Sequence, residues 1–213
     1  MYIPKHFEEL RIDVLHQLIH THPLATLVTM SSNGLNANHI PLSLQPFPQP
    51  LGTLQGHIAR ANTMLTDIAS GSEVLAIFHG AQSYISPSWY ATQKETGKVV
   101  PTWNYSVVHA YGILKTVDDS KWLHRHLEQF TAQNEAAFST PWALSDAPQE
   151  FTEKLINHII GIEMQITRLH GKWKVSQNQP QNNRDGVIKG LKQHQNGSDE
   201  MLKMIGMFSN VDE

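Results

Sequence analysis

Cysteine is absent from the 213 residues, and so are long apolar runs. Without thiols the chain can form no disulfide, no thiolate metal site and no cysteine nucleophile. No apolar stretch approaches the roughly 20 residues that span a bilayer. The first ten residues carry the acidic pair Glu8-Glu9 and lack the apolar core of a signal peptide. We therefore expect a cytoplasmic protein without a membrane segment.

Positive charge is not in excess either. The chain has 16 Lys and Arg against 19 Asp and Glu, a formal net charge of −3. This balance gives no electrostatic argument for nucleic-acid binding, and no segment has the pattern of a helix-turn-helix. We expect no direct contact with nucleic acid, so any effect on transcription would be indirect.

Three familiar catalytic and nucleotide-binding motifs are also missing. The sequence contains no P-loop, no dinucleotide-binding glycine pattern and no nucleophile elbow. Among thirteen histidines, His124 and His126 are spaced two apart on an expected helix, where the side chains point about 200° apart. His20 and His22 lie beside a proline turn without an evident acidic third ligand. We therefore expect no metal site.

The hydrophobic pattern predicts six or seven strands with helices between them, in one α+β barrel domain over residues 1–213. The expected strands cover 24–30, 35–44, 53–59, 73–79 and 99–114, with a further extended segment at 83–86 and a closing hairpin, 161–169 with 173–176. The expected helices cover 7–19, 63–69, 120–137 and 148–160, with 186–191 and 199–208 in a helical tail from about 179.

Turns and loops complete the expected organisation. An Asn-Gly turn within 31–34 joins the first two strands in a hairpin. Pro41 predicts that the second strand lies at a sheet edge or carries a bulge, because proline cannot donate to a sheet. We expect loops at 45–52 and 92–98.

The segment 56–62 is the most informative for function. A strand ends there, Arg60 follows, and Asn62 can cap the next helix. Amides at a helix start, the helix dipole and a guanidinium suit a phosphate dianion. In the competing interpretation, Arg60 is a solvated surface charge and Asn62 is only a cap.

Aromatic residues gather in segments 83–90 and 102–105, flanked by Ser, Thr and Asn. Such residues could enclose and hydrogen-bond a flat heterocycle. They could equally form a barrel core and a dimer interface, which use the same residue types. Segment 172–178 likewise could bring a cation and two amides to a ligand, or could simply end a strand.

Several motifs in order over about the first 190 residues resemble the PaiB family. They are MYIPKHF at the start, HIARAN at 57–62, SYISPSWY at 83–90, VPTWNY at 100–105, VHAYG at 108–112 and KVSQN at 174–178. The family is described as FMN-binding negative transcriptional regulators, related to the pyridoxamine-phosphate-oxidase-like split barrels. The resemblance implies an FMN-binding split β-barrel with peripheral helices, working as a homodimer with two FMN sites at the subunit interface.

The resemblance also implies which residues bind FMN. The phosphate would be held by His57, Ala59, Arg60, Ala61 and Asn62. The ring would lie against Ser86, Trp89, Thr102, Trp103 and Asn104, with Lys174, Ser176 and Gln177 matching a basic and amide stretch. Two positions depart from the family pattern: Thr63 replaces a usual proline, and Gln179 replaces a usual basic residue. The second departure weakens a phosphate role for the 174–178 segment.

Three functions remain open at this point. The chain could be a flavin-binding regulatory or sensor protein, a flavin-dependent oxidoreductase with an unknown small substrate, or a haem-binding split-barrel relative. No acid–base pair is evident near the expected site. Whether the protein is an enzyme therefore stays open.

Overall fold

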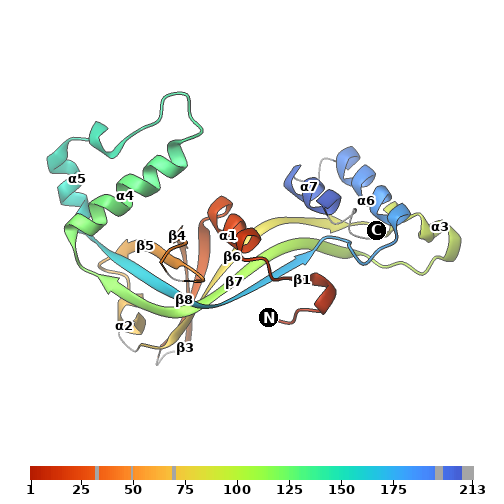
Figure 1. The fold of residues 1–213 in the computed structure, drawn as a ribbon, viewed down its shortest axis with the longest axis horizontal. Helices are drawn as coiled ribbons and strands as arrows, with labels where there is room; N and C mark the ends of the chain where they lie inside the picture. The colour runs from red at the N-terminus through yellow and green to blue at the C-terminus, as the bar shows by residue number, and fades with distance from the viewer. Residues whose placement is uncertain (32–33, 49, 69–70, 195–198, 208–213) are drawn as a thin grey trace. The chain divides into compact units, whose positions relative to one another are not determined.

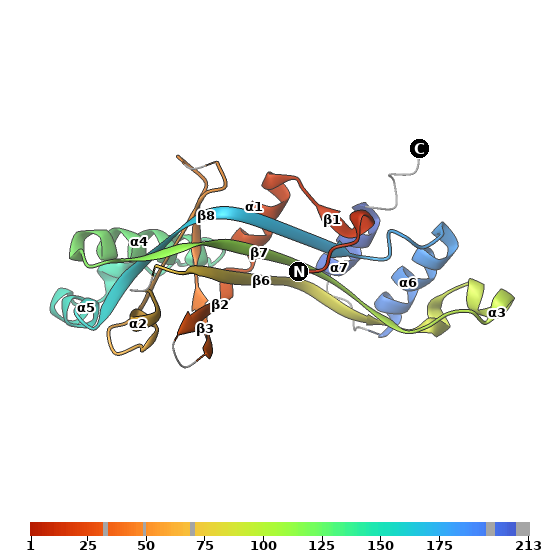
Figure 2. The same ribbon diagram turned by 90° about the horizontal axis from the view of Figure 1, so that it is seen from below.

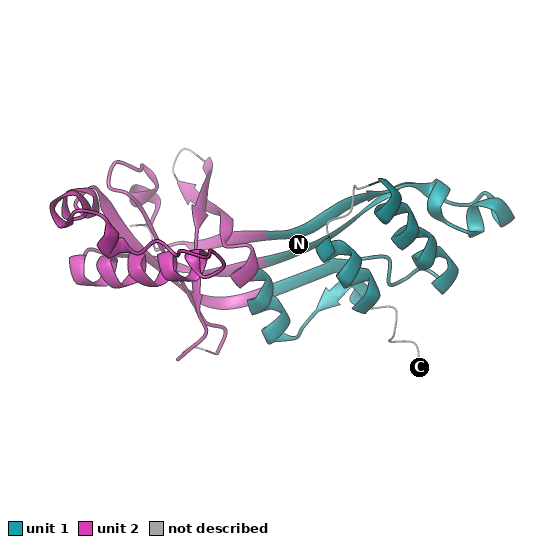
Figure 3. Ribbon diagram, turned by 90° about the horizontal axis from the view of Figure 1, so that it is seen from above, with its two compact units in different colours: residues 1–18, 79–108, 170–213 teal, residues 19–78, 109–169 magenta. Residues whose placement is uncertain are grey.

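The computed structural model describes residues 1–31, 34–48, 50–68, 71–194 and 199–207, which form an α+β fold on an eight-stranded sheet (Figure 1). Two compact units can be distinguished (Figure 3). Unit 1 comprises residues 1–18, 79–108 and 170–213, and unit 2 comprises 19–78 and 109–169. Three long strands have residues in both units: β6 (Glu73–Ile85), β7 (Thr102–Val117) and β8 (Ile159–Lys174).

The strand order in the sheet is β3-β2-β6-β7-β8-β5-β4, and β1 (Glu8–Glu9) pairs with β8. The other strands are β2 (Leu24–Ser31), β3 (Gly34–Pro41), β4 (Ser43–Gln45) and β5 (Thr53–Ala59). Strand β2 pairs antiparallel with β3 and β6, and β5 pairs antiparallel with β4 and β8. The bounds of β5 agree with the sequence expectation.

The first hairpin is confirmed, but its second strand ends at Pro41 and not at residue 44, because residues 43–45 form the separate strand β4, which pairs with β5. Strands β2 and β3 pair from Leu24 opposite Pro41 to Ser31 opposite Gly34. The expected turn residues 32 and 33 lie outside the described residues. Strand β3 is at one end of the strand order, which satisfies Pro41 because an edge position needs no donor from that residue.

Unit 2 has its core between the sheet and its helices α2 (Met64–Ile68), α4 (Ser120–Glu135) and α5 (Gln149–Ile156), with a 3-10 turn at Leu144–Asp146. Along β5, Leu54 and Ile58 are buried, while Gln55 and His57 on the other face are half-buried. Helix α4 begins where Asp119 Oδ1 accepts from the amides of Lys121 and Trp122, at 2.8 and 3.2 Å. This cap fixes the start of the helix that carries Trp122 and His126.

Unit 1 contains most of the remaining helical elements. They are the 3-10 turns Lys5–Phe7 and Pro87–Trp89, and the helices α1 (Ile12–Thr21, its last three residues in unit 2), α3 (Thr92–Thr96), α6 (Gln181–His194) and α7 (Asp199–Met207). Figure 2 shows α6 and α7 side by side, in agreement with their contacts. Within the described ranges, no helix combines the length and the apolar character needed to cross a bilayer.

Two expected interruptions in strands are wrong. Strand β6 continues through Gly80, and β8 continues through His170-Gly171, where a hairpin turn was expected. Both glycines instead lie at close approaches: a Cβ at Gly80 would be 2.2 Å from Ser106 Oγ, and one at Gly171 would be 2.2 Å from Leu15 Cδ2. The glycines therefore make room for a neighbour and do not end the strand.

The ends of several other elements also differ from expectation. The first helix begins at Ile12 and not at Phe7, because residues 8–9 pair with β8. The loop at 92–98 contains α3, which ends at Gly97 with a φ of 66°. Strand β7 begins at Thr102, three residues later than expected, and α5 ends at Ile156, where the chain then enters β8. Long-range strand pairing decided most of these boundaries.

Candidate functional site

The predicted phosphate segment lies at the end of β5 in unit 2. His57 pairs with Gly161 of β8 and Ala59 with Ile159, and the Arg60 amide donates to His158 O at 2.9 Å. Ala59 and Arg60 are exposed. The strand end therefore presents the arginine at the surface of unit 2.

Arg60 already has an acidic partner. Its guanidinium donates two hydrogen bonds to the Asp118 carboxylate, one of them from Nη1 to Oδ2 at 3.1 Å, and its Nε donates to Asn157 O at 3.0 Å. These bonds lower the pKa of Asp118 below its usual range. Exposed ion pairs are weak, so the partner is one that a dianion could displace at little cost.

Asn62 performs the capping that the sequence predicts. Its Oδ1 accepts from the amide of Met64 at 2.9 Å, at the first residue of α2. Its Nδ2 donates to Asn38 Oδ1 at 3.1 Å. Both ends of the Asn62 amide are thus engaged within unit 2, and Asn38 is a neighbour that the sequence did not indicate.

His57 contacts α4 through a second histidine. Its Nδ1 lies 3.3 Å from Nε2 of His126, whose ring is stacked between Trp122 and Phe130 at centroid distances of 5.1 and 5.9 Å. Burial lowers the pKa of His57, and burial together with His57 lowers the pKa of His126 to about 4. At neutral pH both rings are uncharged, so one nitrogen can donate and the other accept.

In unit 1, a pocket of about 310 Å³ brings together four of the predicted residues: Thr102, Asn104, Lys174 and Ser176. We call it the lysine pocket. Its other lining residues are Phe7, Tyr90, Thr92, Lys98, Val99, Val100, Asn178 and Gln179. Four stretches of unit 1, at residue 7 and over 90–92, 98–104 and 174–179, therefore share one hollow.

The lysine pocket holds positive charge without a carboxylate among its lining residues. Lys174 Nζ donates to Thr102 Oγ1 and, at 2.6 Å, to Trp103 O. Burial and the neighbouring Lys172 lower the pKa of Lys174. Lys98, which the sequence did not single out, brings a second ammonium group to the same lining. An electron-rich group is the natural partner for such a set of donors.

Asn104 and Ser176 fix the floor of the lysine pocket. Asn104 Nδ2 donates to Ser176 Oγ at 2.9 Å, and Ser176 Oγ lies 3.2 Å from Asn104 Oδ1, which accepts. Ser176 has a φ of 65°, a left-handed conformation that is uncommon for a side-chain-bearing residue. Gln177 does not line the pocket, because its side chain bonds Val175 N and Trp173 O at 2.8 and 2.5 Å.

Ser86 and Trp89 make contacts within unit 1 that stabilise its local structure. Ser86 Oγ accepts from Ser88 N at 3.3 Å and caps the 3-10 turn. The Trp89 ring packs on α6, where a Cβ at Gly190 would lie 2.3 Å from it, and stacks on His194 at 5.8 Å. The structure thus places Trp89 against the C-terminal helices and not in the lysine pocket.

Trp103 lines a second hollow of unit 1, of about 270 Å³. The ring is 54% exposed and meets Tyr84 edge-on at 6.0 Å. The other lining residues are His79, Gly80, Gln82, Tyr105 and Ser106. We call this hollow the aromatic pocket, since Trp103 and Tyr105 border it.

Ser106 is a residue that the sequence analysis missed. Its Oγ is buried and has no hydrogen-bond partner among the described residues, yet the residue lines the aromatic pocket. A buried hydroxyl without a partner is costly, and such groups usually meet a ligand or water. The available signal was the run Ser106-Val-Val108, where strand alternation is lost.

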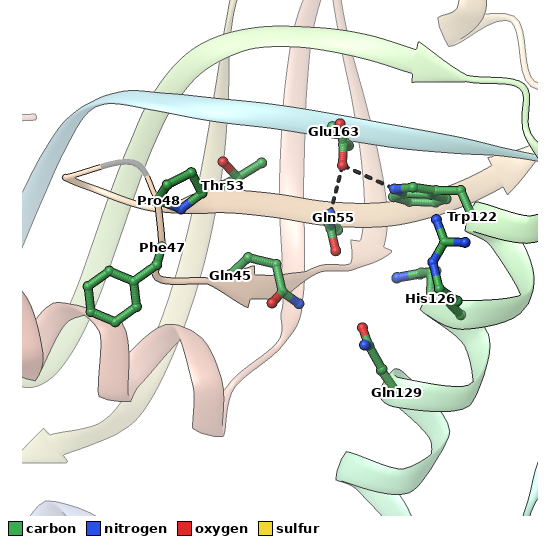
Figure 4. Close-up of a pocket in the computed structure, with 10 residues that line it drawn as sticks. Gln45, Phe47, Pro48, Thr53, Gln55, Trp122, His126, Gln129 and Glu163 are labelled. Atoms are coloured by element: carbon green, nitrogen blue, oxygen red, sulfur yellow. Dashed lines mark hydrogen bonds between the residues drawn. The ribbon is translucent and has the colours of Figure 1, made fainter.

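A third hollow, of about 380 Å³, lies in unit 2 between α4 and the strands β4, β5 and β8 (Figure 4). None of the thirteen predicted residues lines it. It is nevertheless connected to one of them, because His126 lines this hollow and contacts His57.

Comparison with known proteins gives consistent results. Residues 1–168 match the family described as "Putative FMN-binding domain". An uncharacterized protein of Emericella nidulans is 37% identical over 227 residues, covering 90% of each chain. The Bacillus subtilis protein named Protease synthase and sporulation protein PAI 2 is 26% identical over 196 residues, covering 92% of this chain and 91% of that one.

Among solved structures, the flavocytochrome Anf3 from Azotobacter vinelandii has a similar fold. Its TM-score is 0.57 at 11% identity, with 81% of this chain and 72% of that chain covered. At such low identity the likeness concerns the fold alone. It confirms the α+β split β-barrel class that the sequence predicts.

Proposed function

The chain belongs to the family described as "Putative FMN-binding domain", and from this premise we propose that it binds FMN as a homodimer. The segment His57–Asn62 binds the phosphate, and residues of unit 1, from either protomer of the dimer, bind the ring. The observation that carries the proposal is the lysine pocket. It gathers Thr102, Asn104, Lys174 and Ser176, four of the residues that the family resemblance assigns to flavin binding.

The chemistry of the two unit 1 pockets fits a flavin ring. A flavin presents carbonyl oxygens and ring nitrogens along one edge and a flat apolar face. Lys98 and Lys174 supply donors for the edge, exposed Trp103 supplies a stacking surface, and the unpartnered hydroxyl of Ser106 supplies one further polar contact. Bound FMN would supply one- and two-electron redox chemistry, and nearby ammonium groups favour its negatively charged reduced form.

Arg60 would bind the phosphate by exchanging partners. Its guanidinium is neutralised by Asp118. A phosphate dianion carries more charge than a carboxylate and accepts the same bidentate pair of hydrogen bonds. Since the Arg60 side chain is 39% exposed and the Asp118 side chain 64% exposed, neither group requires a change in the core to make this exchange.

At the level of the cell, we propose a cytoplasmic flavin-binding regulatory protein that acts on transcription indirectly. The name of the Bacillus subtilis relative, Protease synthase and sporulation protein PAI 2, is compatible with a regulatory role. The net charge of −3 argues against direct operator binding. The oxidoreductase alternative predicts FMN-dependent oxidation of NADH or NADPH, which steady-state absorbance at 340 nm would detect.

The test of the flavin proposal compares FMN with riboflavin, which lacks the phosphate. Arg60→Ala should weaken FMN about tenfold to a hundredfold, since a charge-assisted contact contributes roughly 1.5–3 kcal/mol. It should leave riboflavin binding nearly unchanged. Flavin fluorescence titration measures both affinities, and Arg125→Ala on α4 is the control. Equal FMN affinity in wild type and Arg60→Ala would place the phosphate elsewhere.

Two further measurements address the cofactor and the assembly. The absorbance spectrum of freshly purified protein should show flavin bands near 370 and 450 nm, as in flavoproteins generally, without a sharp Soret band. Analytical ultracentrifugation at micromolar concentration should give a dimer. A monomer would contradict the homodimer, and stoichiometric haem without competition from FMN would contradict the choice of cofactor.

A further inference from the structure

The hollow of unit 2 in Figure 4 is polar, and none of the residues proposed to bind flavin lines it, although its lining residue His126 contacts His57. We call it the α4 pocket. It has a volume of about 380 Å³, within the range of small-molecule sites. Its lining comes from four elements and one loop: Gln45, Phe47, Pro48, Thr53, Gln55, Trp122, Arg125, His126, Gln129 and Glu163.

Glu163 of β8 lines the pocket with a carboxylate of which only one oxygen accepts hydrogen bonds from the described residues. Its Oε1 accepts from Gln55 Nε2 at 2.7 Å and from Trp122 Nε1 at 3.2 Å, the two dashed lines in Figure 4. Both donors are neutral and both bond the same oxygen. Within the described ranges no cation pairs with this carboxylate, so its negative charge and its Oε2 remain available to a ligand.

Arg125 of α4 brings the opposite charge. It follows Trp122 by three residues on the same helix and lines the same pocket. No ion pair or hydrogen bond of its guanidinium exists in the part of the chain that the structure describes. Arg125 and Glu163 therefore face one pocket without pairing, with more than 4.0 Å between their charged atoms.

Neutral groups complete the lining. Figure 4 shows the amide ends of Gln45 and Gln129 directed into the space between β4 and α4. Thr53 adds a hydroxyl, and Phe47 with the Trp122 ring adds apolar surface. A ligand in this pocket would meet one anion, one cation and several amide groups.

We propose that the α4 pocket binds a free α-amino acid with a polar, uncharged side chain. The ammonium group pairs with Glu163, the carboxylate pairs with Arg125, and the side chain bonds the glutamine amides. A purely cationic ligand would meet the unpaired Arg125, and a purely anionic ligand would meet Glu163. Only a zwitterion satisfies both charges at once. The proposal is independent of flavin binding.

Calorimetry on the full-length protein tests this site with four probes: L-glutamine, L-asparagine, L-serine and L-threonine. At least one should bind with a micromolar to millimolar dissociation constant. For the best probe, the N-acetylated form and the decarboxylated amine should each bind at least tenfold more weakly, because each lacks one charge. No heat from any probe up to 10 mM would overturn the proposal.

Variants then test the two charges separately. Arg125→Met and Glu163→Gln should each weaken the best probe at least tenfold, while Glu128→Gln on the same helix should leave it unchanged. Because Glu163→Gln could disturb Trp122, Arg125→Met at an exposed position is the decisive variant. Unchanged affinity in Arg125→Met, or equal binding of the N-acetylated form, would also overturn the proposal.

Discussion

Arg60 in unit 2 and Lys174 in unit 1 are both cations of segments predicted to bind FMN, but their surroundings differ. Arg60 is exposed at a strand end and bonded to the Asp118 carboxylate. Lys174 is half-buried, bonds a hydroxyl and a carbonyl, and lines a pocket beside Lys98. The first charge is neutralised within the chain, whereas the second has only neutral acceptors.

This difference shows how two cations, Arg60 and Lys174, can contribute to the binding of one ligand in different ways. A neutralised, exposed arginine can bind a strong dianion only by exchanging partners, so its contribution depends on the phosphate. A lysine with neutral acceptors retains its charge for any electron-rich group that enters the pocket. The two segments should therefore respond differently to FMN and riboflavin.

The largest expected effect is a loss of stability at acidic pH, caused by the buried pair His57 and His126 in unit 2. Both pKa values are depressed in the folded chain, that of His126 to about 4, so the unfolded chain binds more protons between about pH 4 and 6.5. The free energy of unfolding should therefore contain the full contribution of the two neutral histidines above pH 6.5. It should fall by about 2–3 kcal/mol as the pH drops towards 4. Urea unfolding across this range measures the loss.

His126→Phe should flatten this dependence on pH, since phenylalanine can keep the stack with Trp122 but cannot titrate. His124→Phe on the same helix is the control and should retain the slope. A wild-type stability that does not change between pH 7 and 4.5 would show that the two rings are not buried as described.

The next effect separates the two cations directly. Lys174→Met should weaken FMN and riboflavin alike, by about tenfold to a hundredfold, because the lysine is proposed to contact the ring and not the phosphate. Flavin fluorescence titration gives both affinities, and Lys121→Met on α4 is the control. A loss confined to FMN would assign the phosphate to Lys174 and would contradict the proposed division of roles.

A smaller effect should follow from removing the partner of Arg60. Asp118→Asn should strengthen FMN binding about twofold to fivefold, the size expected for releasing an exposed ion pair, and should leave riboflavin unchanged. The same titration measures it, with Glu150→Gln as the control. If Asp118→Asn weakened FMN, the aspartate would be positioning Arg60 for the ligand and not competing with it.

The smallest effect is that of Ser106→Ala, which we compare with the loss of a buried hydroxyl in unit 2. Ser106→Ala removes an unpartnered group and should leave stability unchanged or raise it by up to about 1 kcal/mol, while flavin affinity falls a few-fold. Thr29→Val removes the hydroxyl that donates to Asp67 at 2.8 Å and should cost about 1–3 kcal/mol. Equal stability losses in thermal unfolding would mean that Ser106 has a partner in solution.

Local sequence signals predicted local structure well. The alternation over Thr53–Ala59 and the capping by Asn62 place β5 and the start of α2 correctly, because both depend on residues within one or two turns. Pro41 correctly indicated an edge strand. The resemblance of several motifs to one family indicated the fold class, which the solved structures confirm.

Strand continuity required the tertiary structure. The sequence predicted strand breaks at Gly80 and Gly171, yet both glycines lie within long strands. Their missing side chains make room for Ser106 and Leu15. Trp89, which the resemblance assigns to the flavin ring, packs on Gly190 of α6, and its contact with flavin stays a prediction. In each case the deciding neighbour is more than 20 residues away, which a local pattern does not record.

The sequence by itself determined the fold class, the absence of thiol chemistry and the residue types available for a flavin. The tertiary structure decided which of those residues share a pocket: Lys98 joins Lys174, Asp118 neutralises Arg60, and Glu163 faces Arg125 without pairing. The physical reason is that a charge acts through its nearest partners, and strand pairing brings those partners from distant parts of the chain.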